Sequence, residues 1–237
     1  MRSEHSRILW SSAFSLLLAV MGGVAQAGPK PLPTNSNAYG AGYAESTAGW
    51  LEWLLSIPNA TSPLFDTDGS DAAVGQSGKV WFLVGNGSGG DTERTVTVPA
   101  GKALFFPIVN FFWVNLPEWG DNPWSPTQEA WVRDYLADTV DTAQDLVLEI
   151  DGQPIANVSR LRVSGAVGAC TLPVAAADNI FGLDLSPGAH ECVADGYWAL
   201  LPPMSAGRHE IHFAGGFASS GFSLNVTYDI TVVGGKK

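Results

Sequence analysis

Three runs of mainly apolar and β-branched residues lie within residues 79–113 and are separated by turn-forming segments. The Gly-rich segment Asn86–Gly90 follows the first run, and Pro99-Ala100-Gly101-Lys102 follows the second. Runs rich in Val, Phe, Trp and Thr that are broken by Gly and Pro are typical of an antiparallel meander. The pattern therefore predicts three strands joined by a hairpin loop and a tight turn.

A helical pattern precedes these strands, in residues 43–57. Apolar residues recur there at intervals of three and four, which is the spacing of one helix face. We expect Trp50 and Trp53 to pack on a sheet, with Ser46 or Thr47 as the N-cap.

A second helix is predicted to begin at Ser125-Pro126-Thr127-Gln128, which matches a capping box with Pro at the first helical position. The helix should continue to about Thr142 by its periodicity. Its buried face is expected to include Trp131, Tyr135 and Leu136.

The second half of the chain returns to strand patterns. Asp151-Gly152 separates Leu146–Ile150 from Pro154–Val163, and Asp-Gly between apolar runs is a strong hairpin signal. Three further strands are predicted, at Tyr197–Leu201, Arg208–Phe213 and Phe222–Val233.

The order of these elements predicts the fold class. Strands and helices do not alternate regularly, so a parallel sheet is not expected. We predict a mainly β fold, an antiparallel β-sandwich of jelly-roll or Ig-like type with two helical insertions. Residues 43–237 would form one domain, and residues 28–42 a mobile N-terminal segment.

The N-terminus has the three parts of a secretory signal peptide. Arg2 and Arg7 precede an apolar run over residues 8–20, and Ala25-Gln26-Ala27 has the small-residue pattern of a cleavage site. We expect cleavage after Ala27 and a secreted or periplasmic protein. The apolar run is too short and too broken for a comfortable membrane span.

Charge restricts the partners of this chain. The net charge is −11 at pH 7. Nucleic acid requires a compensating positive surface, so it is not expected as a partner. Anionic lipid is disfavoured for the same reason.

Cys170 and Cys192 are the two cysteines of the chain. In an oxidising compartment an isolated pair of this kind favours a disulfide over a metal or catalytic site. We therefore predict a bond between them.

Three motifs resemble those of a family of exported bacterial proteins of unassigned function. They are a VWFLxG motif within Gln76–Gly85, an ERTxTVPAGKALFFPIxN motif at Glu93–Asn110, and an LxPxxxGxHxIxF strand at Leu201–Phe213. The resemblance implies the fold and export, but no activity. Many members of this family carry Cys at positions that correspond to Ala72 and Val96, which implies that apolar packing replaces a family disulfide here.

Asp66, Asp68 and Asp71 surround Gly69 in a pattern that resembles the start of a calcium-binding loop. Ca²⁺ prefers six to eight oxygen ligands, but Ser77 stands where an EF-hand loop needs its bidentate Glu. The pattern leaves two alternatives open: bound Ca²⁺, or an Asp-rich turn whose side chains cap backbone amides.

The Trp-rich connection after the third strand is the strongest candidate for ligand binding. Trp113, Trp119 and Trp124 stand near Asn110 and Asn115, and such residues can stack on sugar rings and bond to hydroxyl groups. The alternative is a satellite hydrophobic cluster beneath the loop.

Weak catalytic candidates are Glu93, Arg94, Glu118 and Asp121, which could supply acid–base chemistry but stand in no diagnostic motif. Three functions remain open from the sequence. The preferred one is an exported, non-catalytic binding protein of the periplasm or cell surface, with glycans as the expected ligand. The others are an exported polysaccharide-active hydrolase or lyase, and a structural protein of the cell envelope.

Overall fold

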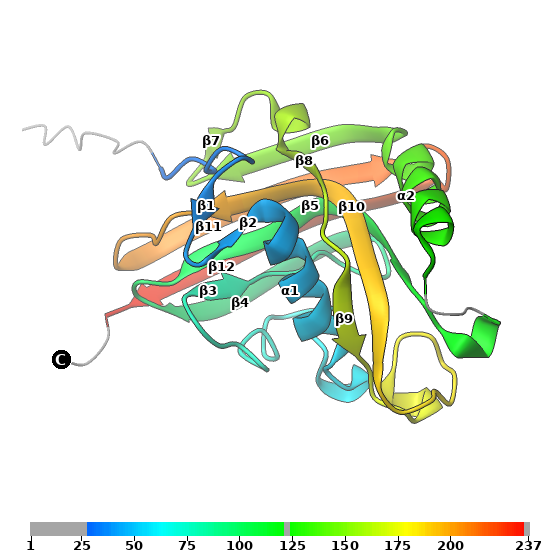
Figure 1. Ribbon diagram of the computed structural model, residues 1–237. Coiled ribbons are helices and arrows are strands. Elements are labelled where there is room, and N and C mark those ends of the chain that lie inside the picture. The colour runs from blue at the N-terminus through cyan, green and yellow to red at the C-terminus, as the bar shows by residue number, and fades with distance from the viewer. Residues whose placement is uncertain (1–27, 121–123, 235–237) are drawn as a thin grey trace, which may run out of the picture.

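The computed structural model describes residues 28–120 and 124–234, so the predicted signal peptide and Asp121 lie outside the described residues. Two five-stranded sheets and two α-helices make up most of this part of the chain, together with short 3-10 helices and a two-stranded ribbon (Figure 1). The prediction of a mainly β fold is confirmed.

Sheet one is centred on two long antiparallel strands, β5 and β10, which pair from Leu104 opposite Leu201 to Val114 opposite Cys192. Strand β3 pairs with β5, and both β8 and β9 pair with β10. The strands of this sheet are β3 (Val80–Phe82), β5 (Ala103–Val114), β8 (Arg162–Ser164), β9 (Gly168–Thr171) and β10 (Ala189–Leu201).

Sheet two has the order β4-β12-β11-β6-β7. Its strands are β4 (Gly90–Pro99), β6 (Ala143–Ile150), β7 (Gln153–Pro154), β11 (Gly207–Phe217) and β12 (Phe222–Val233). Strand β12 has the bounds that the sequence pattern predicts. The small ribbon pairs β1 (Asn37–Ala38) with β2 (Ala41–Gly42) just before the first helix.

The two sheets share one buried hydrophobic cluster. Phe106 and Ile108 of β5 belong to it with Ile211 and Phe213 of β11. The rings of Phe106 and Phe213 lie 5.2 Å apart between centroids. Ala72 and Val96 are buried in the same cluster, so both are apolar core positions, and their correspondence to family cysteines stays a prediction.

The predicted meander over residues 79–113 is wrong. Strand β4 belongs to sheet two and pairs in parallel with β12, while β3 and β5 pair in parallel in sheet one. The sheets are therefore not purely antiparallel. The Gly-rich segment carries the chain from one sheet to the other, and local sequence patterns do not distinguish such a crossing from a hairpin, because the pairing partner of β4 is far away in the chain.

Helix α1 (Tyr43–Leu55) covers the outer face of sheet one. Trp50 and Trp53 are buried as predicted, and the ring of Trp50 lies 5.3 Å from that of Trp198 on β10. The N-cap prediction is wrong because Gly42 caps the helix. Ser46 lies inside the first turn and donates back to the carbonyl of Gly42 at 2.7 Å.

Helix α2 (Pro126–Val140) begins with the predicted capping box, in which the Ser125 hydroxyl accepts from the backbone N–H of Gln128. The predicted buried face is partly wrong. Leu136 is buried with Val132 and Val140, at spacings of four, whereas Trp131 and Tyr135 occupy the neighbouring stripe and are exposed. The helix has two adjoining apolar stripes, and the aliphatic one packs against the protein.

The Asp151-Gly152 hairpin is confirmed, with φ of 52° and 69° at the two turn residues. Its second strand is only two residues long, so the predicted strand Pro154–Val163 is wrong over most of its length. A 3-10 helix at Val158–Leu161 instead leads the chain back to sheet one.

The predicted disulfide between Cys170 and Cys192 is confirmed, and it links β9 to β10. At the entry to the domain, the amide of Leu32 donates to the carbonyl of Leu200 at 2.8 Å. Residues 28–42 are therefore attached to sheet one at this point, and their mobility stays a prediction.

Candidate functional site

Four aromatic side chains from three elements meet beside the outer end of β5. We call Trp113, Trp119, Trp131 and Tyr135 the aromatic platform. The centroid of the Trp113 ring lies 6.1 Å from Trp119, 5.7 Å from Trp131 and 5.5 Å from Tyr135. All three contacts are edge-to-face, which is a favourable geometry for aromatic pairs.

Three elements position these rings: β5, α2 and a short 3-10 helix. Trp113 lies near the end of β5, opposite Val193 of β10. Trp131 and Tyr135 are four residues apart on α2, which puts them one above the other on the helix surface. Their rings are 5.7 Å apart and nearly parallel, with an interplanar angle of 12°.

Trp119 ends the short 3-10 helix η2 (Pro117–Trp119) and completes the platform. Its ring also contacts Phe181, at 5.3 Å between centroids, in the loop that the disulfide closes. Trp119, Trp131 and Tyr135 are 48%, 55% and 40% exposed. Large aromatic rings with this degree of exposure form a surface that is open to a ligand.

The structure brings together only some of the residues that the sequence predicts for a ligand site. Trp113 and Trp119 join the platform. Trp124 is half-buried and packs against the cluster of Val132, Leu136 and Val193, as the alternative of a satellite cluster predicts for it. Sequence reasoning missed Trp131 and Tyr135, because it assigned them to the buried face. An aromatic pair four residues apart, beside a separate aliphatic stripe, is the signal that could have found them.

Two glutamates hold the segment that carries Trp119. Glu191 Oε2 accepts from Asn115 Nδ2 at 2.9 Å and from the backbone N–H of Trp124 at 2.7 Å. Asn115 is buried and serves as part of this attachment. Asn115 and Trp124 are therefore both attached to Glu191 of β10.

Glu118 makes a further link, from η2 to the disulfide loop. Its Oε1 accepts from the backbone N–H of Ser186 at 2.6 Å. Hydrogen bonds from the Ser186 side chain and from the backbone lower the pKa of Glu118 below its usual range, since they favour the charged form. Glu118, which the sequence offered as a catalytic candidate, therefore links η2 to the disulfide loop.

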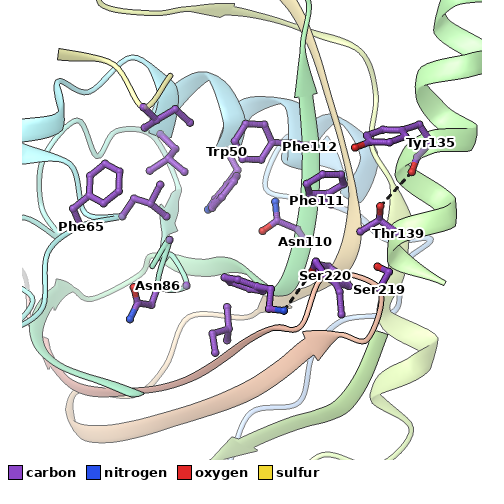
Figure 2. Close-up of a pocket in the computed structure, with 18 residues that line it drawn as sticks. Trp50, Phe65, Asn86, Asn110, Phe111, Phe112, Tyr135, Thr139, Ser219 and Ser220 are labelled. Carbon is purple, nitrogen blue, oxygen red and sulfur yellow. Dashed lines mark hydrogen bonds between the residues drawn. The ribbon is translucent and has the colours of Figure 1, made fainter. Parts of the chain in front are cut away.

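A cleft of about 640 Å³ adjoins the platform at Tyr135 (Figure 2). It is bounded by α1, by the end of β5, by α2, and by the loop between β11 and β12. Its apolar lining residues are Trp50, Leu54, Leu64, Phe65, Phe111, Phe112, Ile180, Phe217, Phe222 and Leu224. Asn110, a predicted ligand contact, lines this cleft instead of joining the platform.

The remaining catalytic candidates lie elsewhere. Arg94 is 1% exposed and donates to three backbone carbonyls, those of Asp66, Val84 and Gly85, and to the Tyr228 hydroxyl. Burial is the main cause that raises the pKa of Tyr228. The buried guanidinium of Arg94 therefore bonds to groups within the protein, which is a structural role.

Glu93 is exposed on sheet two, in a shallow depression that it shares with Asp91, Asn225 and Thr227. Asp91 Oδ1 accepts from Asn225 Nδ2 at 3.0 Å. Glu93 and Arg94 project to opposite faces of β4, as neighbouring strand residues do. The structure does not bring Glu93, Arg94 and Glu118 into one site.

The acidic loop is organised around Asp66. Its carboxylate accepts from the backbone N–H groups of Asp68 and Gly69 at 2.9 Å and from that of Asp71 at 3.0 Å. Bonds from Ser70 lower the pKa of Asp68. Across the described ranges, no three His, Cys, Asp or Glu side chains gather closely enough to hold a metal ion. The turn alternative accounts for these contacts, and Ca²⁺ stays a prediction.

The two histidines of β11 have separate partners. His209 Nδ1 lies 2.9 Å from Asp151 Oδ2, and His212 Nε2 lies 2.6 Å from Asn225 Oδ1.

Within residues 28–120 and 124–234, neither helix has the length and hydropathy that a bilayer-spanning segment requires.

Comparisons with known proteins leave the family open. No family model matches this chain, and no curated protein matches it. Two solved structures show weak similarity. One is described as PbICP-C in complex with falcipain-2, with 13% identity, a TM-score of 0.22, and coverage of 66% of this chain and 100% of the other. The second is described as the solution structure of amebosin, with 9% identity, a TM-score of 0.18, and coverage of 62% and 100%. At these TM-scores neither similarity supports an inference about fold or function.

Proposed function

We propose that this protein is an exported, non-catalytic binding protein of the periplasm or cell surface, and that it binds glycans on the aromatic platform. The observation that carries the proposal is the exposure of Trp119, Trp131 and Tyr135 around the edge of Trp113. Flat aromatic rings stack on the apolar faces of sugar rings, and their apolar area is costly to leave in water.

Attachment of the surrounding loop also supports binding. The links from Glu191 and Glu118 hold η2 against sheet one and the disulfide loop. A platform that is rigid before the ligand arrives loses less conformational entropy on binding. Asp134, exposed on α2 and one residue before Tyr135 in the sequence, is a further source of carboxylate oxygens for sugar hydroxyls.

Two further parts of the proposal concern architecture and location. We propose that the two sheets form a β-sandwich, which their shared hydrophobic cluster supports. Export through cleavage after Ala27 is supported by the disulfide between Cys170 and Cys192, because such bonds persist in oxidising compartments.

Retention on insoluble polysaccharides tests the function. The wild-type protein is applied to a panel of immobilised glycans, together with the variants Trp119→Ala and Trp131→Ala. Phe65→Ala is the matched control, since Phe65 is exposed but lies outside the platform. We expect retention of the wild type and of the control, and loss of retention in both platform variants. Equal retention of all four proteins would overturn the proposal.

A further inference from the structure

A second ligand site lies in the cleft beside the platform. We propose that the cleft binds an uncharged, mainly apolar small molecule, such as an ester of an acyl chain. The site is distinct from the glycan platform, although both include Tyr135. Its volume, about 640 Å³, falls within the range of roughly 300–1,000 Å³ typical of small-molecule sites.

The walls of the cleft are apolar and fixed by contacts within the protein. Trp50 Nε1 donates to the carbonyl of Leu83 at 2.8 Å, which anchors one wall. Phe217, another lining residue, contacts Phe111 and Phe222, at 6.4 and 6.3 Å between ring centroids. The cleft therefore exists before a ligand binds, and an apolar ligand gains by leaving water for it.

The lining excludes a charged ligand. Among the described residues that line the cleft there is no Asp, Glu, Lys, Arg or His. A carboxylate or ammonium group would lose its hydration there without a counter-charge, which is strongly unfavourable. The polar lining consists of amides and hydroxyls, so it forms no ion pair with a ligand.

Asn110 is a polar residue of the lining, and Figure 2 shows its side chain beside Trp50. The Nδ2 atom is buried and has no hydrogen-bond partner among the described residues. Because it is closed to solvent, it offers no donor to a molecule in the cleft, and the apolar lining determines what the cleft binds.

The neighbouring strand explains why the protein itself leaves this amide free. Asn110 pairs with Gly196 of β10, which has no side chain to offer. A Cβ atom at position 196 would lie 2.6 Å from the Cβ of Asn110 and 2.6 Å from the carbonyl oxygen of Val109. No larger residue fits there without displacing β5, so the cross-strand position cannot supply a partner.

Fluorescence titration tests the site with the full-length mature protein. The probe is N-phenyl-1-naphthylamine, which is uncharged, apolar and lacks an oxygen acceptor. Methyl laurate and laurate then compete with it at neutral pH. We expect saturable probe binding, and displacement by the ester at concentrations at least about tenfold lower than by the carboxylate, because burial of the carboxylate is unfavourable. Absence of saturable probe binding, or equal competition by laurate, would overturn the proposal.

Variants locate the binding. Thr139→Trp places a large ring in the cleft, and Asp138→Trp places the same ring on the exposed side of the same helix turn. We expect loss of probe binding in Thr139→Trp and wild-type binding in Asp138→Trp. Wild-type binding in both variants would show that the probe binds elsewhere.

The double variant Trp119→Ala/Trp131→Ala should retain probe binding, so failure of the platform and failure of the cleft are distinguishable.

Discussion

The ring of Trp131 lies 5.7 Å from the ring of Tyr135 and nearly parallel to it, and both rings are exposed on the outer side of α2. The buried stripe of the same helix, Val132, Leu136 and Val140, holds α2 on the protein. The helix thus uses one stripe for packing and leaves the adjoining aromatic stripe free, which is why we assign the aromatic pair to binding.

This division predicts a separation between stability and binding at Trp131. Trp131→Ala should lower the free energy of unfolding by only about 1 kcal/mol, through loss of its ring contacts with Trp113 and Tyr135. Leu136→Ala, on the buried stripe, should lower it by about 2–5 kcal/mol, because it removes packed methyl groups and leaves a cavity. Urea denaturation of both variants measures the difference. Similar losses in the two variants would contradict the assignment of the stripes.

Arg94 is predicted to stabilise the fold without taking part in binding. Arg94→Met keeps much of the aliphatic stem but leaves the carbonyls of Asp66 and Gly85 without their donor. We expect a loss of about 3 kcal/mol or more in unfolding free energy, since buried acceptors lose their partners. Glu93→Gln, at the exposed neighbouring position, is the control and should be close to neutral. A stable Arg94→Met variant with impaired glycan retention would contradict this structural role.

The environment of Tyr43 predicts that the protein loses stability at alkaline pH. Its hydroxyl donates to the carbonyl of Leu32 at 2.6 Å and accepts from the amide of Leu200 at 3.1 Å. Burial raises the pKa of Tyr43 to about 12, because it disfavours the phenolate. The contribution of the protonated Tyr43 to the free energy of unfolding is fully present below the ordinary tyrosine pKa of about 10. It is lost as the pH rises towards the pKa of the folded state.

The variant Tyr43→Phe should therefore be less stable than the wild type by about 1 kcal/mol near neutral pH, through loss of the two hydrogen bonds. This difference in unfolding free energy should shrink as the pH rises above about 10. There the unfolded chain loses the tyrosine proton while the folded protein keeps it, which lowers the stability of the wild type. Denaturant unfolding at a series of pH values measures both effects. A difference that stays constant or grows with rising pH would refute the assignment.

Glu118 predicts a change at acidic pH. Bonds from Ser186 lower its pKa, so its contribution to stability is present above the ordinary glutamate value of about 4.3 and is lost as the pH falls through the folded value. NMR titration of the Glu118 carboxyl carbon should give a pKa below that value. Glu118→Gln should make exchange of the Ser186 amide hydrogen faster at neutral pH. The protection of this amide should also change less in the variant than in the wild type when the pH is lowered. An ordinary pKa with unchanged exchange would show that the link is absent.

Local chemistry made several elements predictable from the sequence. The capping box at Ser125, the hairpin at Asp151-Gly152 and the bond between Cys170 and Cys192 depend on residues in or beside the feature itself. The assignment of strands to sheets was not predictable, because it depends on distant partners. Asp91 of β4 bonds to Asn225 of β12, which is 134 positions away.

The candidate site was predictable only in part, for a related reason. Trp113 and Trp119 stand close together in the sequence, and their neighbourhood indicates a ligand loop. Trp131 and Tyr135 belong to a helix with two apolar stripes, and only the packing of α2 against Val193 decides which stripe is buried. The cleft around Asn110 combines segments from across the chain, so no local pattern indicates it.

Isothermal titration of an oligosaccharide from a retained polysaccharide measures glycan binding by the aromatic platform most directly, with the wild type, Trp131→Ala and the control Phe65→Ala. We predict saturable binding to the wild type and to the control, and at least about tenfold weaker binding to Trp131→Ala, the effect expected from loss of one stacking ring. Binding to Trp131→Ala with wild-type affinity, or equal weakening in Phe65→Ala, would contradict the assignment of the platform.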